Sequence, residues 1–422
     1  MIFADDFGFL PENSGTENAK ALQAAVDNGG EIRVRMPGVY DLSEPIALGN
    51  DTTLIFEKGV TVRRQPSESG VNGNTFINKG LFDGVCNTNI RLIGLHLLCN
   101  GVESTGIGKN SRYVGLRAQV GFINVKDLVV DDFDCRGLLA KDYALQVGNF
   151  ENIRLENLFI EGDKDGVHLA IGKNFVIRHA KFRTFDDPIA LNAFDYSVSN
   201  THVGWIENGL IEDCYDLDDD TTTGYFCRML GGSWLPWFAG MPVHHSDTVC
   251  YNGRIYRVVM NPTDGKIYTS NTPPTHERGY AEYDGIGWVC TQEGDFLNTG
   301  CRNILFRNIY LQKKRTIAMA LDLNHDTYAH SCYPGSVPVP HSGIVMENVS
   351  VENEIEYLLR ANYPTADVTI RDTDIKKSKV RFERGALEET VYPKAIITLK
   401  NVRGAGENFS SDGINTYKIK EE

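Results

Sequence analysis

Short runs in which apolar and polar residues alternate recur along most of the chain. In segments 125–133, 151–159 and 173–182, an Asn or Asp is followed by alternating Ile, Val, Leu and Phe. The step is 25 residues from Asp127 to Asn152 and 22 residues from Asn152 to Asn174. Alternation with this composition predicts one short β-strand per copy. Further copies of the pattern occupy residues 88–95, 301–309, 343–349 and 396–402.

A unit of this length cannot bury its own apolar face, so successive copies must stack as a solenoid. Leucine-rich repeats have a similar length but need a fixed leucine signature, and these runs are dominated by Ile, Val and Phe. We therefore predict an all-β chain folded as a right-handed parallel β-helix.

One helix is expected, over residues 16–28, with Thr16 as its N-cap and Gly29 and Gly30 after its end. It is well placed to cover the open apolar end of the solenoid. Four units are predicted: an N-terminal cap with the first coils at 1–60, the main coils at 61–236, an inserted small β subdomain at 237–300, and C-terminal coils with a tail at 301–422.

The expected insert is rich in Gly, Pro and aromatic residues. Its segment 246–256, Ser-Asp-Thr-Val-Cys-Tyr-Asn-Gly-Arg-Ile-Tyr, is followed by Trp288. This pattern resembles the small carbohydrate-binding modules of the chitin-binding type, which implies that the insert binds glycan.

The charge balance limits the classes of partner that this protein can bind. Lys and Arg number 42 against 56 Asp and Glu, which gives a net charge of -14 and would repel a phosphate backbone. We expect no nucleic-acid partner. No run of 18 apolar residues is present, so no membrane partner is expected either.

The N-terminus lacks the basic and apolar regions of a signal peptide. Localisation therefore stays open between a secreted or envelope protein whose signal peptide was trimmed and a cytoplasmic one. The sequence does not indicate an oligomeric state.

Nine cysteines without a C-x-x-C pair give no zinc motif and no complete disulfide framework. Buried thiols are favoured over disulfides because several cysteines end apolar runs. The acidic run 216–220 lacks the Gly and distal Glu of a calcium loop. We expect no metal and no cofactor.

Three aspartates are the candidate catalytic residues. Asp165 and Asp187 are 22 residues apart, which is one coil, and Asp186 precedes Asp187. Because stacked strands lie about 4.7–4.9 Å apart, equivalent positions of successive coils bring their side chains together. The sequence therefore predicts a cluster of three carboxylates.

Such a cluster suits the cleavage of an acetal, which needs one protonated carboxyl to donate to the leaving oxygen and one carboxylate to activate water. Aspartates also cap turns without further function. An Asp-Asp pair stacked on a third Asp crowds negative charge, and this crowding favours the catalytic interpretation.

The strings around these residues resemble the polygalacturonases, the family-28 glycoside hydrolases. Residues 163–166, Asp-Lys-Asp-Gly, match the family's Asn-Thr-Asp-Gly, and residues 185–191, Phe-Asp-Asp-Pro-Ile-Ala-Leu, match its Gly/Gln-Asp-Asp-Cys-Ile-Ala-Ile. The resemblance covers residues 1–235 and 300–404 and is strong at 150–195.

The resemblance implies that Asp186 is the general acid and that Asp165 and Asp187 activate water in an inverting mechanism, with about 6.5–9.5 Å between acid and base. The expected substrate-binding residues are Lys164, His168, Arg228, Trp234 and Trp237. Arg228 occupies the place of the family's Arg-Ile-Lys strand, and the two tryptophans are candidate platforms for sugar rings.

The sequence differs from the family's motifs at two places that bear on the identity of the substrate. Leu230 replaces the family's lysine, and the family's Gly-His-Gly loop is missing at 205–209. Polygalacturonan is therefore not the expected substrate, and the sugar stays open. Two alternatives remain: a polysaccharide lyase on the same scaffold, or a non-catalytic glycan-binding or phage-type β-helix protein.

Overall fold

The computed structural model describes residues 1–81, 83–104, 115–219, 223–385, 391–404 and 408–422. Asp220, which belongs to the acidic run 216–220, lies outside these ranges. Within them no helix is long and apolar enough to cross a membrane.

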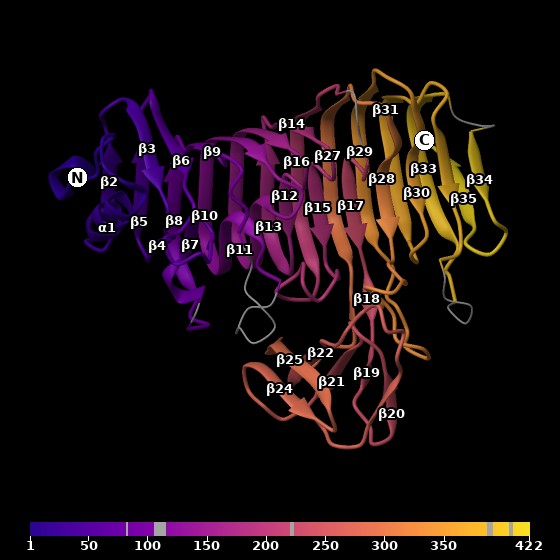
Figure 1. Cartoon of the computed structure of the whole chain (residues 1–422). Helices are drawn as coiled ribbons and strands as arrows, with labels where there is room; N and C mark the ends of the chain where they lie inside the picture. Colours follow the sequence, from indigo (N-terminus) through magenta and orange to yellow (C-terminus); the bar gives the residue numbers. More distant parts are fainter. Residues whose placement is uncertain (82, 105–114, 220–222, 386–390, 405–407) are drawn as a thin grey trace.

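The chain is mostly β and forms a long stack of parallel strands, a parallel β-helix, as predicted (Figure 1). Its first strands are β1 (Ile2–Phe3), β2 (Gly30–Val34), β3 (Gly38–Leu42), β4 (Ile46–Leu48), β5 (Thr52–Phe56), β6 (Val60–Arg64), β7 (Phe76–Asn78), β8 (Asn87–Ile93) and β9 (His96–Leu98). The middle strands are β10 (Ala118–Leu138), β11 (Tyr143–Gly162), β12 (Val167–Leu169), β13 (Gly172–Arg178), β14 (Lys181–Thr184), β15 (Ile189–Asn192), β16 (Ile206–Asp216) and β17 (Cys227–Leu230). The last strands are β27 (Cys301–Leu311), β28 (Arg315–Asp322), β29 (Ser342–Val351), β30 (Ile355–Ala361), β31 (Asp367–Asp374), β32 (Lys379–Phe382), β33 (Ala395–Arg403), β34 (Phe409–Ser411) and β35 (Tyr417–Glu421).

The polar residue that leads each repeat lies within a strand and has a left-handed backbone conformation. Asn152, Asn174, Asn208 and Asn303 have φ between 57 and 61°, a left-handed conformation that Asn adopts more readily than most residues. Each of the last three donates its side-chain N–H to the side-chain oxygen of the Asn one coil earlier, over 3.0–3.2 Å. This ladder fixes the position of successive coils.

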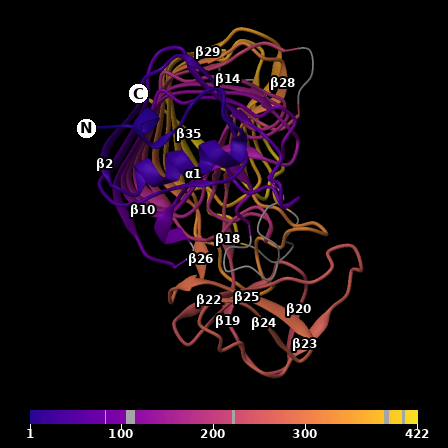
Figure 2. The same ribbon diagram turned by 60° about the vertical axis from the view of Figure 1, so that its left-hand side comes forward.

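The helix α1 (Gly15–Val26) lies across the N-terminal end of the coil and covers the first strands (Figure 2). Its N-cap is Ser14, not Thr16 as predicted. Ser14 and Glu17 form a reciprocal capping box, whereas the Thr16 hydroxyl bonds to Glu68 over 2.7 Å. Two short 3-10 turns, Ala4–Phe7 and Lys79–Leu81, complete the helical segments that the structure describes.

A separate lobe projects from the side of the β-helix (Figure 1). Its strands are β18 (Gly232–Ser233), β19 (Leu235–Pro236), β20 (Met241–Val243), β21 (Thr248–Tyr251), β22 (Arg254–Val258), β23 (Tyr268–Ser270), β24 (Gly279–Tyr283), β25 (Ile286–Glu293) and β26 (Asn298–Thr299). Strands β19, β21, β22, β25 and β24 form one sheet around a core that includes Trp234, Tyr256 and Trp288. The boundaries of the four expected units stay a prediction.

Inside the β-helix, apolar residues from the successive coils form one continuous core. All nine cysteines are free, and eight of them are buried, in agreement with the expectation of buried thiols. The three aspartates lie immediately before strands β12 and β15. These two strands belong to one stacked column, β11–β12–β15–β17–β28.

Candidate active site

The register of the column brings the aspartates together. Val167 pairs with Ile189, so the residues two positions earlier, Asp165 and Asp187, are equivalent in adjacent coils. The N–H of Gly166 donates to the carbonyl of Asp187 over 2.9 Å, which fixes this position. One side-chain oxygen from each of Asp165, Asp186 and Asp187 lies within 4.8 Å of the others.

The three carboxylates differ in exposure. Asp165 and Asp187 are each 1% exposed, whereas the side chain of Asp186 is 22% exposed. Asp186 is therefore the member of the cluster that a ligand from solvent can reach. The close spacing corrects one expectation, since the oxygens do not lie about 6.5–9.5 Å apart.

Asp165 is held in its ionised form. Burial by itself would raise the pKa of this carboxyl, but Lys164 and His168 outweigh burial and hold the pKa well below its usual range. The Lys164 ammonium lies 3.3 Å from Asp165 Oδ1, and His168 Nδ1 lies 3.2 Å from Asp165 Oδ2. Lys164 also pairs with Asp186. Burial by itself would lower the pKa of Lys164, but the two carboxylates outweigh burial and raise it.

The pKa of Asp187 shifts in the opposite direction. Burial raises the pKa of Asp187 to about 8, against the opposing charge of Arg228, and the charges of Asp165 and Asp186 add to the rise. Arg228 Nε lies 3.1 Å from Asp187 Oδ2, and the peptide N–H of Tyr225 donates to Asp187 Oδ1 over 2.8 Å. The cluster therefore combines a protonated carboxyl with an ionised one.

Two further residues belong to this site that the sequence reasoning did not select. Asp195, which is 1% exposed, lies 3.6 Å from the Arg228 guanidinium and 3.9 Å from His168 Nε2. Gly224 lies against the paired aspartates, and a Cβ there would collide with Oδ1 of both. Asp195 could have been selected from the sequence, because it is a further acidic residue three positions after the strand that follows Asp186 and Asp187. No feature of the sequence pointed to Gly224.

Three of the predicted substrate-binding residues join the cluster. The His168 ring stacks on Tyr143 with 4.1 Å between the centroids, and Lys164 and Arg228 pair with the carboxylates as described. In the column, His168 pairs with Ala190, and Ala190 pairs with Arg228. The small Ala190 side chain leaves room between the two longer ones.

The two tryptophans do not join the cluster. Trp234 is 1% exposed, packs against Phe194 and Phe296, and donates its indole N–H to the carbonyl of Phe296 over 2.8 Å. This corrects its assignment as a sugar platform, because a buried ring has no face for a sugar. Trp237 is half-buried and donates to Ser270 Oγ, within the projecting lobe.

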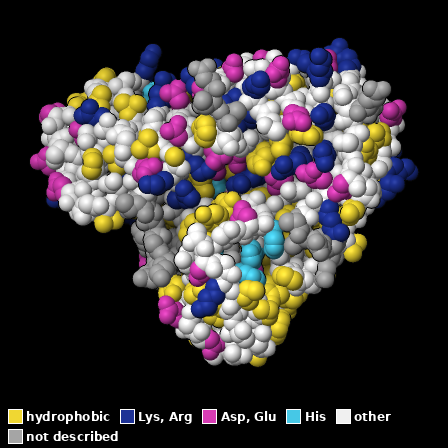
Figure 3. Space-filling view, turned by 45° about the vertical axis from the view of Figure 1, so that its right-hand side comes forward, with side chains coloured by type: hydrophobic (Ala, Val, Ile, Leu, Met, Phe, Trp, Pro, Cys, Tyr) yellow, Lys and Arg dark blue, Asp and Glu magenta, His cyan; other side chains and the backbone are white. Residues whose placement is uncertain are grey.

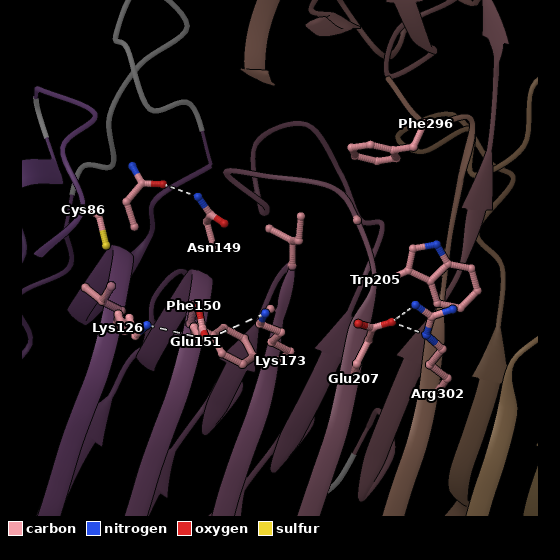
Figure 4. Close-up of a pocket in the computed structure, with 15 residues that line it drawn as sticks. Cys86, Lys126, Asn149, Phe150, Glu151, Lys173, Trp205, Glu207, Phe296 and Arg302 are labelled. Carbon is pink, nitrogen blue, oxygen red and sulfur yellow. Dashed lines mark hydrogen bonds and ion pairs between the residues drawn. The ribbon is translucent and has the colours of Figure 1, made fainter. Parts of the chain in front are cut away.

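Two of the hollows in the described part of the β-helix are lined by none of the three aspartates. One, of about 480 Å³, lies between the β-helix and Phe296 (Figure 4). There the Arg302 guanidinium covers the Trp205 ring at 4.8 Å, and Glu151 lies between two lysines. The other, of about 1370 Å³, includes Phe185.

The structure is similar to several solved β-helices. They include the N-terminal fragment of bacteriophage Phi29 gene product 12, with 12% identity and a TM-score of 0.50, covering 99% of this chain and 65% of the fragment. The family 28 exopolygalacturonase of Yersinia enterocolitica has 11% identity and a TM-score of 0.46, covering 99% of this chain and 78% of the enzyme. The adhesin PfbA of Streptococcus pneumoniae has 13% identity and a TM-score of 0.49, covering 100% of this chain and 99% of the adhesin.

These matches concern the fold. The chain spans 65% of the length of the phage fragment, and that match supports the β-helix class. No protein-family model matches the chain, and no curated protein matches its sequence. A likeness at 12% identity shows the fold and does not select an activity.

Proposed function

We propose that this protein hydrolyses a glycosidic bond in a polysaccharide or oligosaccharide with Asp165, Asp186 and Asp187. The observation that carries the proposal is the convergence of three carboxyl groups, one exposed and two buried, with one oxygen of each within 4.8 Å of the others. The pKa values of the two buried members shift in opposite directions. Asp187 keeps a proton with a pKa of about 8, whereas Asp165 stays ionised beside Lys164 and His168. General acid and base catalysis of acetal cleavage needs this combination.

The roles follow from exposure. Asp186 is the most exposed of the three and delivers the proton to the glycosidic oxygen. Asp187 is its neighbour in the chain and holds the proton at neutral pH, so the pair acts as one acid. Asp165 is the base: it accepts the proton that the attacking water loses as the water oxygen bonds to the anomeric carbon, while the bond from that carbon to the leaving oxygen breaks.

We propose inversion as the stereochemical outcome. A retaining enzyme needs a carboxylate that attacks the anomeric carbon and forms a covalent intermediate. Asp165 and Asp187 are too buried for that attack, and Asp186 serves as the acid. Water is then the nucleophile, despite a spacing shorter than the usual range for inverting enzymes.

The bases at the site argue against the lyase alternative. A lyase needs a neutral side chain that removes a proton next to a uronate carboxylate. Lys164 and Arg228 are both half-buried, and flanking carboxylates outweigh the effect of burial, raise their pKa values and keep them charged. Because both cations already have anionic partners, a neutral sugar fits this site better than a uronate.

Product analysis with a panel of neutral and acidic glycans tests the proposal. Hydrolysis releases new reducing ends from a neutral glycan without unsaturated, ultraviolet-absorbing products. An unsaturated product would establish the lyase instead. Binding without any cleavage across the panel would favour the glycan-binding alternative. Proton NMR of the first product tests inversion, which release of the retained anomer would contradict.

A further inference from the structure

A second cluster of ligating side chains lies where the projecting lobe meets the β-helix. His244 and Asp247 come from the segment between β20 and β21, and His330 comes from the loop after β28. One ligating atom from each of the three lies within 4.8 Å of the others. Figure 3 shows histidine side chains gathered on the lobe near this junction.

The carboxylate of Asp247 is at the centre of the cluster. It is 1% exposed, and its two oxygens face two different imidazoles. Oδ1 lies 3.1 Å from His330 Nδ1, and Oδ2 lies 3.4 Å from His244 Nδ1. The side chains of His330 and His244 are 15% and 36% exposed, so one side of the cluster opens to solvent.

We propose that His244, Asp247 and His330 bind one divalent transition-metal ion. Two imidazoles and one carboxylate form a donor set that suits zinc and related ions. Zinc bonds of about 2.0–2.2 Å in a tetrahedron place ligand atoms about 3.4 Å apart. The two distances around Asp247 are close to this value, so the ion can enter with small movements of the rings.

The surroundings hold the ligands in place. The peptide N–H of His244 donates to Asp247 Oδ2 over 2.7 Å, which fixes the carboxylate. The Tyr333 hydroxyl donates to the carbonyl of Pro242 over 2.7 Å and joins the loop after β28 to the segment that carries His244. A site with fixed ligands binds metal without a large ordering cost.

Such an ion would join two parts of the chain. Asp247 and His330 are 83 residues apart, one in the lobe and one in the β-helix. The same loop carries Tyr328, whose ring contacts that of Tyr196 at a centroid distance of 6.2 Å, and Tyr196 follows Asp195 of the carboxylate cluster. Bound metal would therefore hold both the lobe and the loop that borders the candidate active site.

Calorimetric titration of metal-free full-length protein with Zn²⁺ tests the site. We expect one ion per chain, and His330→Ala and His244→Ala should each weaken binding by at least about tenfold. His96→Ala, an exposed histidine of β9, is the matched control and should bind as the unaltered protein does. Ca²⁺ and Mg²⁺ should not compete, because these ions prefer sets of oxygen ligands.

A second measurement separates binding from damage to the fold. Each metal-free variant serves as its own baseline, since losing a partner of the buried Asp247 carboxylate lowers stability by itself. Zn²⁺ should raise the melting temperature of the parent and leave that of each variant unchanged. The proposal is overturned if the parent binds no Zn²⁺, or if His330→Ala and His244→Ala keep its affinity and stoichiometry. Neither readout depends on glycosidase activity.

Discussion

Asp165 and Asp187 occupy the same position in adjacent coils, yet the pKa values of their carboxyl groups shift in opposite directions. Both are buried, but Asp165 faces Lys164 and His168, whereas Asp187 faces Arg228 and two other acids. The repeat alone would make the two positions alike. Lys164 and His168 lower the pKa of Asp165, whereas burial raises the pKa of Asp187.

The rate should fall on the alkaline side as Asp187 loses its proton. Its pKa of about 8 places the fall of kcat/KM near pH 8. The measurement is the rate on a cleaved glycan between pH 5 and 10. A profile that stays flat through pH 9 would show that this proton is not used.

Replacing Asp187 by Asn should change how stability depends on pH. The Asp187 pKa is about 8 in the folded state against an ordinary value of 3.8. Between these values the folded state binds the extra proton, so this group's contribution to stability falls as the pH rises. Asn cannot ionise, so Asp187→Asn should gain melting temperature relative to the parent between pH 5 and pH 8, by a few degrees. An unchanged difference across this range would contradict the raised pKa.

Lys164 should set the acidic side of the activity profile. Its charge lowers the pKa of Asp165, so Lys164→Met should raise that pKa and move the acidic fall of kcat/KM to higher pH by about one unit or more. Lys164→Arg keeps the charge and serves as the control. If the methionine variant keeps the parent's acidic limb, Lys164 does not tune Asp165.

Trp234 and Trp237 should both contribute to the stability of the fold, and Trp234 should contribute more. Trp234→Ala removes a fully buried ring and should lower the free energy of unfolding by about 3–5 kcal/mol. Trp237→Ala should cost less, because that ring is half-buried. Chemical denaturation measures both. If Trp234→Ala stays stable and only KM rises, the ring contacts substrate after all.

The repeat explains why the sequence predicts the fold and the contact between Asp165 and Asp187. Each Asn-led copy is a local signal, and stacking turns a 22-residue spacing into a contact between Asp165 and Asp187. The helix was predicted from the same kind of local signal, although its N-cap is Ser14, which forms a capping box with Glu17.

The remaining residues depend on segments that leave the coil. Trp234 is buried by Phe194 and Phe296, which are distant in the sequence. The cluster of His244, Asp247 and His330 joins positions 83 residues apart, so no ligand spacing was legible. The pKa values of the clustered aspartates could not be predicted from the sequence either, because burial and neighbouring charges determine them.

The turnover of Asp186→Asn tests the central claim most directly. Asp163→Asn is the matched control, since Asp163 is an exposed carboxylate next to the cluster and its loss changes the net charge equally. On a glycan that the parent cleaves, we predict that Asp186→Asn lowers kcat by about 10²–10⁴-fold with an unchanged melting profile, whereas Asp163→Asn keeps the parent's rate. Wild-type turnover by a folded Asp186→Asn variant would contradict the assignment of this cluster as the hydrolytic site.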